Sequence, residues 1–464
     1  MPGPTVPAFM ARARQVEPEK RRGKGWLIPV SAVLLIALIG GGIWVAALLS
    51  TNKKEDGAEI RRWLTMLGRG GNVQVVVRET SAELARNPRN ALALRARSDA
   101  YYLSNETDQG KRDAEEVERL LANAGSAEEY EARCHAKWRL GRVDEAVSDC
   151  TRAIEFDPQF AWGYESRALA YTDKQDFDHA IASYNTAIQL DPQFALAYNN
   201  RGNVFTNKGE YDRALIDYNK AIELDPQFVL AYTNRGLVYS YKTNYDQAMA
   251  DYNKAIELDP RNALAYNSRG VLHNFKREYE SAIADYKKAI ELNSRFAEAY
   301  DNLGVVYYSR QEYDNAIANY NKAIELNPRF ANAYSDRGLA YYYRKDYDRT
   351  IGDYDKAIEL DPGNADAYNN RGLAHYYKQD YDLAMADYSK AIELNPGMAS
   401  AYNNRGILHV VKHQYDLAIA DYNKAIEVNP QFALAYSNRA IAYEATGDSE
   451  RAAADRQKAE QLKK

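Results

Sequence analysis

Residues 195–228 read ALAYNNRGNVFTNKGEYDRALIDYNKAIELDPQF, and variants of this 34-residue unit follow one another along most of the chain. With the first alanine of the quoted stretch as position 1, units begin at residues 127, 161, 195, 229, 263, 297, 331, 365, 399 and 433. Eight prolines mark the period at position 32, and Ser294 fills the one place on this grid that lacks a proline. A fixed period of this length is the sequence signature of a repeat array.

The residues that recur within the unit predict two helices. Tyrosine occupies position 4 in all ten units and a small residue occupies position 8, as Tyr198 and Gly202 do in the quoted unit. Positions 4, 8 and 11 share one face of a first helix, and positions 17, 20, 24, 27 and 28 share one face of a second. Glycine in mid-helix costs about 1 kcal/mol relative to alanine, so its recurrence predicts that the two helices touch there.

A correlation between two charged positions predicts an ion pair inside each hairpin. Arginine at position 7 accompanies aspartate at position 23 in eight of the ten units. In the unit at 297 both residues change together, to Leu303 and Asn319. A partly buried pair is costly to break on one side only, so we interpret it as structural.

The unit resembles the tetratricopeptide repeat, with tyrosine in the slot at position 4 that this family usually gives to tryptophan. The unit at 229 carries the rest of the family pattern in Gly236, Tyr239, Ala248, Tyr252, Ala255 and Pro260. The resemblance covers ten tandem units in residues 127–464, the last of which is expected to act as a cap. It implies an all-α fold, a right-handed superhelical solenoid of helix-turn-helix repeats whose first helices line the concave side.

Residues 51–126 look like a degenerate, repeat-like helical region. Asn87-Pro88 matches the closing pair of a unit, and Ala91-Leu92-Ala93-Leu94 restarts one. The segment from Val73 to Val77 has strand propensity, but the repeat register predicts a helix there.

The N-terminal residues predict a membrane anchor. Residues 25–52 carry no charge, and about 20 apolar helical residues cross a hydrocarbon core of ~30 Å, so we expect a transmembrane helix at residues 25–50. A cleaved signal peptide is the alternative, but the long polar leader of residues 1–24 disfavours it. Six basic residues precede the span and four closely follow it. This bias favours an N-terminus inside and repeats on the far, periplasmic or extracytoplasmic, side.

Composition and motifs limit the chemistry. The chain has 60 Lys plus Arg against 65 Asp plus Glu, a net charge of −5 that argues against a nucleic-acid partner. It has no nucleophile–base pairing, HExxH motif or supported pair of catalytic carboxylates, and its six histidines are scattered. We therefore expect no enzyme activity, no cofactor and no metal. Cys134 and Cys150, at positions 8 and 24 of one unit, should face each other as two buried free thiols, with a disulfide as the alternative in an oxidising compartment.

The candidate binding residues lie on the opposite side of the first helix from its packing stripe. Positions 2, 6, 9 and 13 fall within about 60° of one another there, and we call this side the groove face. Position 6 is often asparagine, position 9 is apolar in eight of the nine units from 161 onward, and positions 12 and 13 become aromatic in mid-array. Such a surface indicates binding, unless neighbouring hairpins bury it. The candidate peptide-binding residues are Asn200, Asn234, Asn302, Asn370, Asn404, Asn438, Tyr241, Tyr308, Tyr342, Tyr343, Tyr376 and Tyr377.

We expect a membrane-anchored interaction scaffold that holds protein or extended peptide ligands in a concave groove. Asparagine amides would pair with the ligand backbone, because each offers donors and an acceptor. A co-chaperone adaptor that captures acidic C-termini is one alternative, disfavoured because the groove face has no Lys or Arg from unit 161 onward. An import-receptor-like adaptor facing the cytosol and a non-catalytic arm of an enzyme complex are the others.

Overall fold

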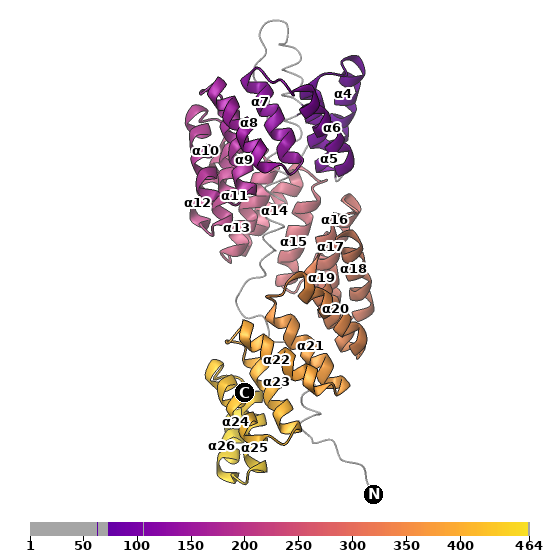
Figure 1. Cartoon of the computed structure of the whole chain (residues 1–464), viewed down its shortest axis with the longest axis vertical. Helices are drawn as coiled ribbons and strands as arrows, with labels where there is room; N and C mark the ends of the chain where they lie inside the picture. The colour runs from indigo at the N-terminus through magenta and orange to yellow at the C-terminus, as the bar shows by residue number, and fades with distance from the viewer. Residues whose placement is uncertain (1–62, 64–72, 105, 463–464) are drawn as a thin grey trace. The chain divides into compact units, whose positions relative to one another are not determined.

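The computed structural model describes Trp63 and residues 73–104 and 106–462. These residues form 23 α-helices and no β-strand, which confirms the predicted all-α fold (Figure 1). They fall into two compact units, of which one ends at Arg295 and the other begins at Phe296. The helices are α4 (Val73–Arg86), α5 (Ala91–Leu103), α6 (Thr107–Leu120), α7 (Ala127–Arg139), α8 (Val143–Phe156), α9 (Ala161–Asp173), α10 (Phe177–Leu190), α11 (Ala195–Asn207), α12 (Tyr211–Leu224), α13 (Val229–Tyr241), α14 (Tyr245–Leu258), α15 (Ala263–Phe275), α16 (Tyr279–Leu292), α17 (Ala297–Ser309), α18 (Tyr313–Leu326), α19 (Ala331–Tyr343), α20 (Tyr347–Leu360), α21 (Ala365–Lys378), α22 (Tyr381–Leu394), α23 (Ala399–Val411), α24 (Tyr415–Val428), α25 (Ala433–Ala445) and α26 (Ser449–Leu462).

Each 34-residue unit folds as one helical hairpin, from α7–α8 to α25–α26. The helices α5 and α6 form a further hairpin before them, and α4 packs on α5. Because α4 begins at Val73, the helix predicted for residues 73–77 is confirmed despite their strand propensity. The Asn87-Pro88 pair lies in the turn between α4 and α5.

The turn inside every hairpin from 127 onward places position 15 in the left-handed region. Its φ lies between 58° and 85° in all ten hairpins, and the residue is glycine only at Gly141, Gly209 and Gly447. The following amide donates back to the carbonyl at position 11, as the Asn244 amide does to the Tyr239 carbonyl at 2.8 Å. This six-residue closure satisfies carbonyls that the end of the first helix would leave unpaired.

The two helices of a hairpin meet where glycine faces tyrosine. Position 24 places a tyrosine ring over the glycine at position 8, as Tyr218 does over Gly202, and Tyr218 is 1% exposed. A Cβ atom added at Gly202 would lie 2.8 Å from the ring carbon Cε1. The predicted close contact is confirmed, and it explains why position 8 stays small.

The predicted ion pair is present in all eight hairpins that carry both residues. The Arg201 guanidinium donates through Nε and Nη2 to the two oxygens of Asp217, at 2.8 and 2.7 Å. Its remaining nitrogen Nη1 donates at 2.6 Å to Asn185 Oδ1 of the preceding unit. One arginine therefore closes its own hairpin and fastens it to the previous one.

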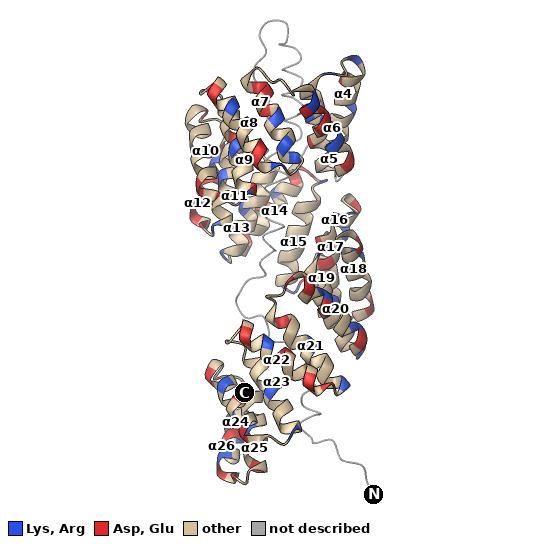
Figure 2. Ribbon diagram, in the orientation of Figure 1, with Lys and Arg blue, Asp and Glu red and all other residues tan. Residues whose placement is uncertain are grey.

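A second ion pair joins consecutive repeats at their turn ends. The cation at position 14 reaches the aspartate at position 18 of the preceding unit, as Lys208 Nζ does to Asp178 Oδ1 at 2.8 Å. Lys242 makes the same contact with Asp212 at 2.6 Å. Basic and acidic residues are accordingly interspersed along the helices of each unit (Figure 2).

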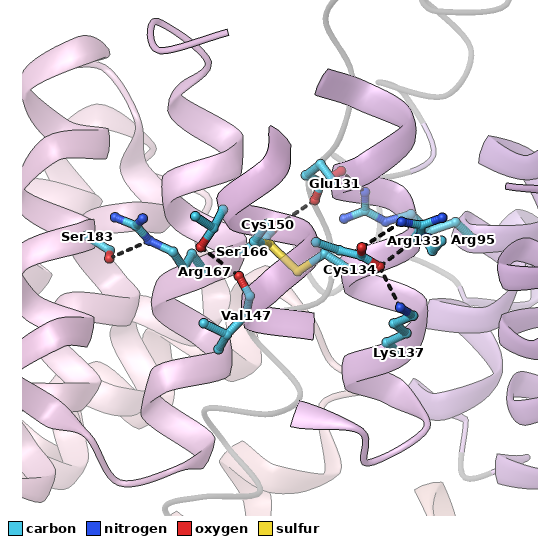
Figure 3. The surroundings of a disulfide bond; sticks show 12 residues. Arg95, Glu131, Arg133, Cys134, Lys137, Val147, Cys150, Ser166, Arg167 and Ser183 are labelled. Carbon is cyan, nitrogen blue, oxygen red and sulfur yellow. Dashed lines mark hydrogen bonds and ion pairs between the residues drawn. A yellow bond between two sulfur atoms is a disulfide. The ribbon is translucent and has the colours of Figure 1, made fainter. Parts of the chain in front are cut away.

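The expectation of two free thiols is wrong. Cys134 on α7 and Cys150 on α8 form a disulfide, with 5.4 Å between their Cα atoms (Figure 3). The physical reason is that positions 8 and 24 are the points of closest approach of the two helices, and this separation is the usual one for a disulfide.

The predicted tail at residues 1–24 and the predicted transmembrane helix at residues 25–50 lie outside the described residues. Among the helices from α4 to α26, none combines the length and the apolar character needed to cross a membrane.

We predict that Gly304→Ala destabilises the array by about 1–3 kcal/mol, the usual cost of overpacking. A Cβ atom there would lie 2.6 Å from Tyr320 Cε1. Gly338→Ala is the matched control, because its Cβ would meet nothing closer than Asp353 Cβ at 3.2 Å. There the higher helix propensity of alanine, up to about 1 kcal/mol, offsets the contact. Chemical denaturation followed by circular dichroism measures both variants, and equal stabilities would contradict the prediction.

Candidate functional site

The asparagines at position 6 are part of the packing between repeats. Asn200, Asn234, Asn404 and Asn438 are only 2–5% exposed, so the expectation that they lie open in a groove is corrected. The reason is the approach of neighbouring first helices, which brings position 6 of one unit against position 5 of the unit before. The Asn234 amide donates at 3.1 Å to Asn199 Oδ1, and the Asn438 amide donates at 2.8 Å to Asn403 Oδ1.

These contacts form a hydrogen-bonded row, which we call the polar row, across successive first helices. In the compact unit that ends at Arg295, the row runs from Asn234 to Asn199 and from Asn199 Nδ2 to Asn200 Oδ1 at 3.0 Å. It continues from Asn200 Nδ2 to Glu165 Oε1 at 3.0 Å. In the compact unit that begins at Phe296, the Asn404 amide donates to Asn369 Oδ1 at 3.0 Å. Through these bonds each of these asparagines has at least one hydrogen-bond partner, whereas the buried oxygens Asn234 Oδ1 and Asn404 Oδ1 have none among the described residues.

The other two candidate asparagines are less enclosed. Asn302 and Asn370 are partly exposed. Asn370 Oδ1 accepts a hydrogen bond of 3.2 Å from Asn369 Nδ2, so it too belongs to the polar row.

At its N-terminal end the polar row includes acidic side chains and an ion pair. The hydroxyl of Ser166 donates to Glu131 Oε1 at 2.5 Å, and the other oxygen of Glu131 pairs with Arg95 on α5. Glu165 accepts a hydrogen bond of 3.0 Å from the Asn200 amide and a further one from Ser166. Burial raises the pKa of Glu165 to about 8, with the nearby Glu131 charge adding to the effect. Its carboxyl is therefore mostly neutral at pH 7.

Neighbouring hairpins also bury much of position 9. Leu169, Leu237, Val305 and Ile407 are between 4% and 7% exposed, whereas Val271, Leu339, Leu373 and Ile441 stay partly exposed. Of the eight apolar side chains at position 9, four are thus buried between hairpins and four remain partly exposed on the groove face.

The aromatic candidates form a continuous cluster in the compact unit that begins at Phe296. The rings of Tyr308 and Tyr343 contact each other at 5.7 Å between centroids, and those of Tyr342 and Tyr377 at 5.8 Å. Tyrosines at position 17 complete it, since Tyr313 stacks on Tyr343 at 5.6 Å and Tyr347 stacks on Tyr377 at 5.4 Å. We call this cluster the tyrosine ladder; its members are Tyr308, Tyr313, Tyr342, Tyr343, Tyr347, Tyr376, Tyr377 and Tyr381.

The tyrosine ladder lies at the turn ends of three consecutive hairpins. Positions 12 and 13 end the first helices α17, α19 and α21, and position 17 begins the second helices α18, α20 and α22. All eight side chains are partly exposed. Tyr241, the remaining candidate, belongs to the compact unit that ends at Arg295. Its ring stacks on that of Tyr211, with 5.4 Å between the centroids.

The hydroxyls of Tyr308, Tyr342 and Tyr376 remain protonated at neutral pH. Burial raises the pKa of Tyr376 to about 12 and raises the pKa of Tyr308 and of Tyr342 as well. The Tyr376 hydroxyl oxygen is itself buried and has no hydrogen-bond partner among the described residues.

Sequence reasoning missed the partners at positions 5 and 17. Position 5 is polar in every unit, as in Glu165, Asn199 and Asn403, and two adjacent polar positions in each repeat indicate a contact between repeats. Position 17 was assigned only to the core, although its tyrosines also reach the next first helix. Over the described part of the chain, no group of three or more His, Cys, Asp or Glu side chains is placed to hold a metal.

We predict that Glu165→Gln removes a pH dependence from the stability. A carboxyl whose pKa rises from 4.5 to about 8 on folding binds its proton more tightly in the folded chain. The stability of the wild type should therefore fall as the pH rises between these values, by about 1.4 kcal/mol per pH unit more steeply than that of the variant. Urea denaturation at several pH values measures this difference. The exposed Glu155→Gln is the control, and parallel curves for wild type and Glu165→Gln would refute the prediction.

Comparisons with known proteins find many solved structures that are similar to the chain, among them three crystal structures. YrrB, described as a TPR protein with an unusual peptide-binding site, is 27% identical over 40% of this chain and 95% of its own, with a TM-score of 0.35. Yeast Tom70 is 17% identical over 80% of this chain and 92% of its own, with a TM-score of 0.40. A tetratricopeptide repeat protein from Parabacteroides merdae is 21% identical over 53% of this chain and 98% of its own, with a TM-score of 0.42. No curated protein sequence matches the chain.

Sequence models of the repeat family match most of the array. A TPR repeat model matches residues 168–209, 202–242, 276–311, 306–343 and 338–379. Two tetratricopeptide repeat models match residues 229–262, 365–398 and 399–432, and residues 251–284 and 421–454. Together these matches cover residues 168–454, more than half of the chain, and the chain belongs to the tetratricopeptide repeat family.

Proposed function

We propose that this chain is a membrane-anchored scaffold that binds protein or extended peptide segments, and that the tyrosine ladder is its main contact surface. Tetratricopeptide repeats in general support protein interaction. The observation that carries the proposal is the ladder itself, which runs through three consecutive hairpins with every ring partly exposed.

The chemistry of the ladder suits a protein ligand. Tyrosine combines a large apolar ring with a polar tip, and such residues dominate binding energy at protein interfaces. The rings already support one another through stacked and edge contacts, so little side-chain freedom is lost when a ligand arrives. Asn302 and Asn370, the less enclosed candidates, would add polar contacts on the groove face.

The charges beside the ladder suit a ligand without strong charge. Arg344 pairs with Asp314, and Lys378 pairs with Asp348. Both cations lie at the turn ends, next to the ladder, and both are neutralised by the preceding repeat. Binding should therefore depend little on ionic strength.

The proposed location is the far side of a membrane, anchored by residues 25–50. The uncharged run and the basic bias of six residues against four support it. The disulfide between Cys134 and Cys150 supports it further, because disulfides persist in oxidising compartments.

We predict that Tyr342→Ser with Tyr343→Ser weakens partner binding at least tenfold, because the double change removes the centre of the ladder. Serine already occupies these positions in other units, as Ser240 and Ser309, so the hairpin should keep its helicity. Partners are first captured from membranes with a photo-crosslinking amino acid at position 343, and the affinity of the captured protein is then measured for both chains.

The matched control is Tyr245→Val, which removes an aromatic stack outside the ladder and installs the residue that Val143 provides at the same position. Equal affinities for wild type and the serine variant, at equal helicity, would show that the ladder is packing alone.

We predict that protease added to intact cells or spheroplasts digests the array and spares the N-terminal tail, because the basic bias holds that tail inside. Antibodies against a tag at each end distinguish the two segments. Protection of the array until the membrane is broken would reverse the proposed orientation.

A further inference from the structure

The first complete repeat is built differently from the nine that follow it. In the hairpin α7–α8, positions 8 and 24 hold Cys134 and Cys150, whereas seven later hairpins hold a glycine under a tyrosine ring. Positions 11 and 17 of this hairpin hold Lys137 and Val143. At position 11 every later unit has Tyr, Phe or His, and at position 17 all later units except the last have Tyr or Phe.

This hairpin therefore lacks the three aromatic side chains that the eight hairpins in residues 161–432 have at positions 11, 17 and 24. Lys137 is held in polar contacts, with Nζ 2.9 Å from Asp149 Oδ2 and 3.4 Å from Glu145 Oε2. The apolar cluster around the cystine consists of Trp138, Ala146 and Ala170, with Val143 and Val147 at its border. Both sulfurs belong to side chains that are fully buried. The covalent bond joins the two helices at the point where later hairpins have the glycine–tyrosine contact.

The same hairpin fastens the N-terminal helices to the array. Arg95 on α5 pairs with Glu131 on α7, and Arg139 on α7 donates at 2.9 Å to Asp99 on α5. The hydroxyl of Tyr102 donates at 3.0 Å to the carbonyl of Arg139. Each of these contacts requires α7 to keep its place.

We propose that the Cys134–Cys150 disulfide is a redox-dependent clasp, which closes hairpin α7–α8 and thereby holds α4, α5 and α6 on the array. Closure is a thiol–disulfide exchange with a small disulfide such as glutathione disulfide. The thiolate of one cysteine attacks the reagent and releases one glutathione, and the thiolate of the other then displaces the second, so two protein thiols become one disulfide and two reduced glutathiones form. Reduction by a dithiol reverses the exchange, and because both cysteines are buried it requires α7 and α8 to part first.

Hydrogen–deuterium exchange on the full chain in detergent tests the clasp. Dithiothreitol should raise the exchange of α7 and α8, and of α4 to α6, at least tenfold, and leave α13 and α14 unchanged. Iodoacetamide labelling in denaturant confirms that both thiols are free. Unchanged exchange in the reduced chain would overturn the proposal, and so would full labelling of both cysteines before any reductant is added.

Two cysteine-free variants separate loss of the bond from effects of the reagent. Cys134→Ser with Cys150→Ser should exchange like the reduced wild type. Cys134→Gly with Cys150→Tyr restores the pair of the later hairpins and should exchange more slowly than the serine variant. Neither should respond to dithiothreitol, because the chain has only two cysteines. A serine variant as protected as the oxidised wild type would overturn the proposal.

Discussion

The contact between a glycine and a tyrosine ring sets the distance between the two helices of a hairpin, and the other contacts depend on that distance. With Tyr218 lying on Gly202, the helices are close enough for Arg201 to reach both oxygens of Asp217. The same arginine then has one nitrogen left for Asn185 of the previous unit. Where tyrosine fills position 24, a residue larger than glycine at position 8 would push the helices apart and loosen an ion pair and an inter-repeat hydrogen bond together.

The sequence predicts most of the hairpin because its contacts join residues at fixed spacings. Arg201 and Asp217 change in step with their counterparts in other units, so their pairing can be recognised without a structure. The polar row could not be predicted in the same way. It depends on how closely one first helix approaches the next, which the spacing of residues within a single helix does not reveal. The disulfide was missed for a different reason, since the choice between thiols and a bond depends on the compartment as well as on geometry.

The burial of Asn200 and Asn404 changes what the groove face can offer. Amides that bond to the neighbouring repeat are not free to hold a ligand backbone, so recognition would rest on side chains that keep partial exposure. The tyrosine ladder meets that condition, and it occupies hairpins of one compact unit. The position-17 tyrosines Tyr313 and Tyr347 were assigned to the core, yet they stack on rings of the next repeat. They show that one residue can serve its own hairpin and a surface at the same time.

The boundary between the two compact units coincides with a change in the repeat. It follows Arg295, next to Ser294 in place of proline, and the hairpin after it has Leu303 and Asn319 in place of the arginine–aspartate pair. Elsewhere the bonds between repeats join residues separated by a constant number of positions, 35 for Asn234 with Asn199 and 30 for Lys208 with Asp178. Such an array can lengthen or shorten by recombination of whole units, because every new junction repeats an existing one. Loss of a single residue would change the spacing of every pair that spans it and disrupt those contacts, so we expect the length of the array to change by whole units of 34 codons.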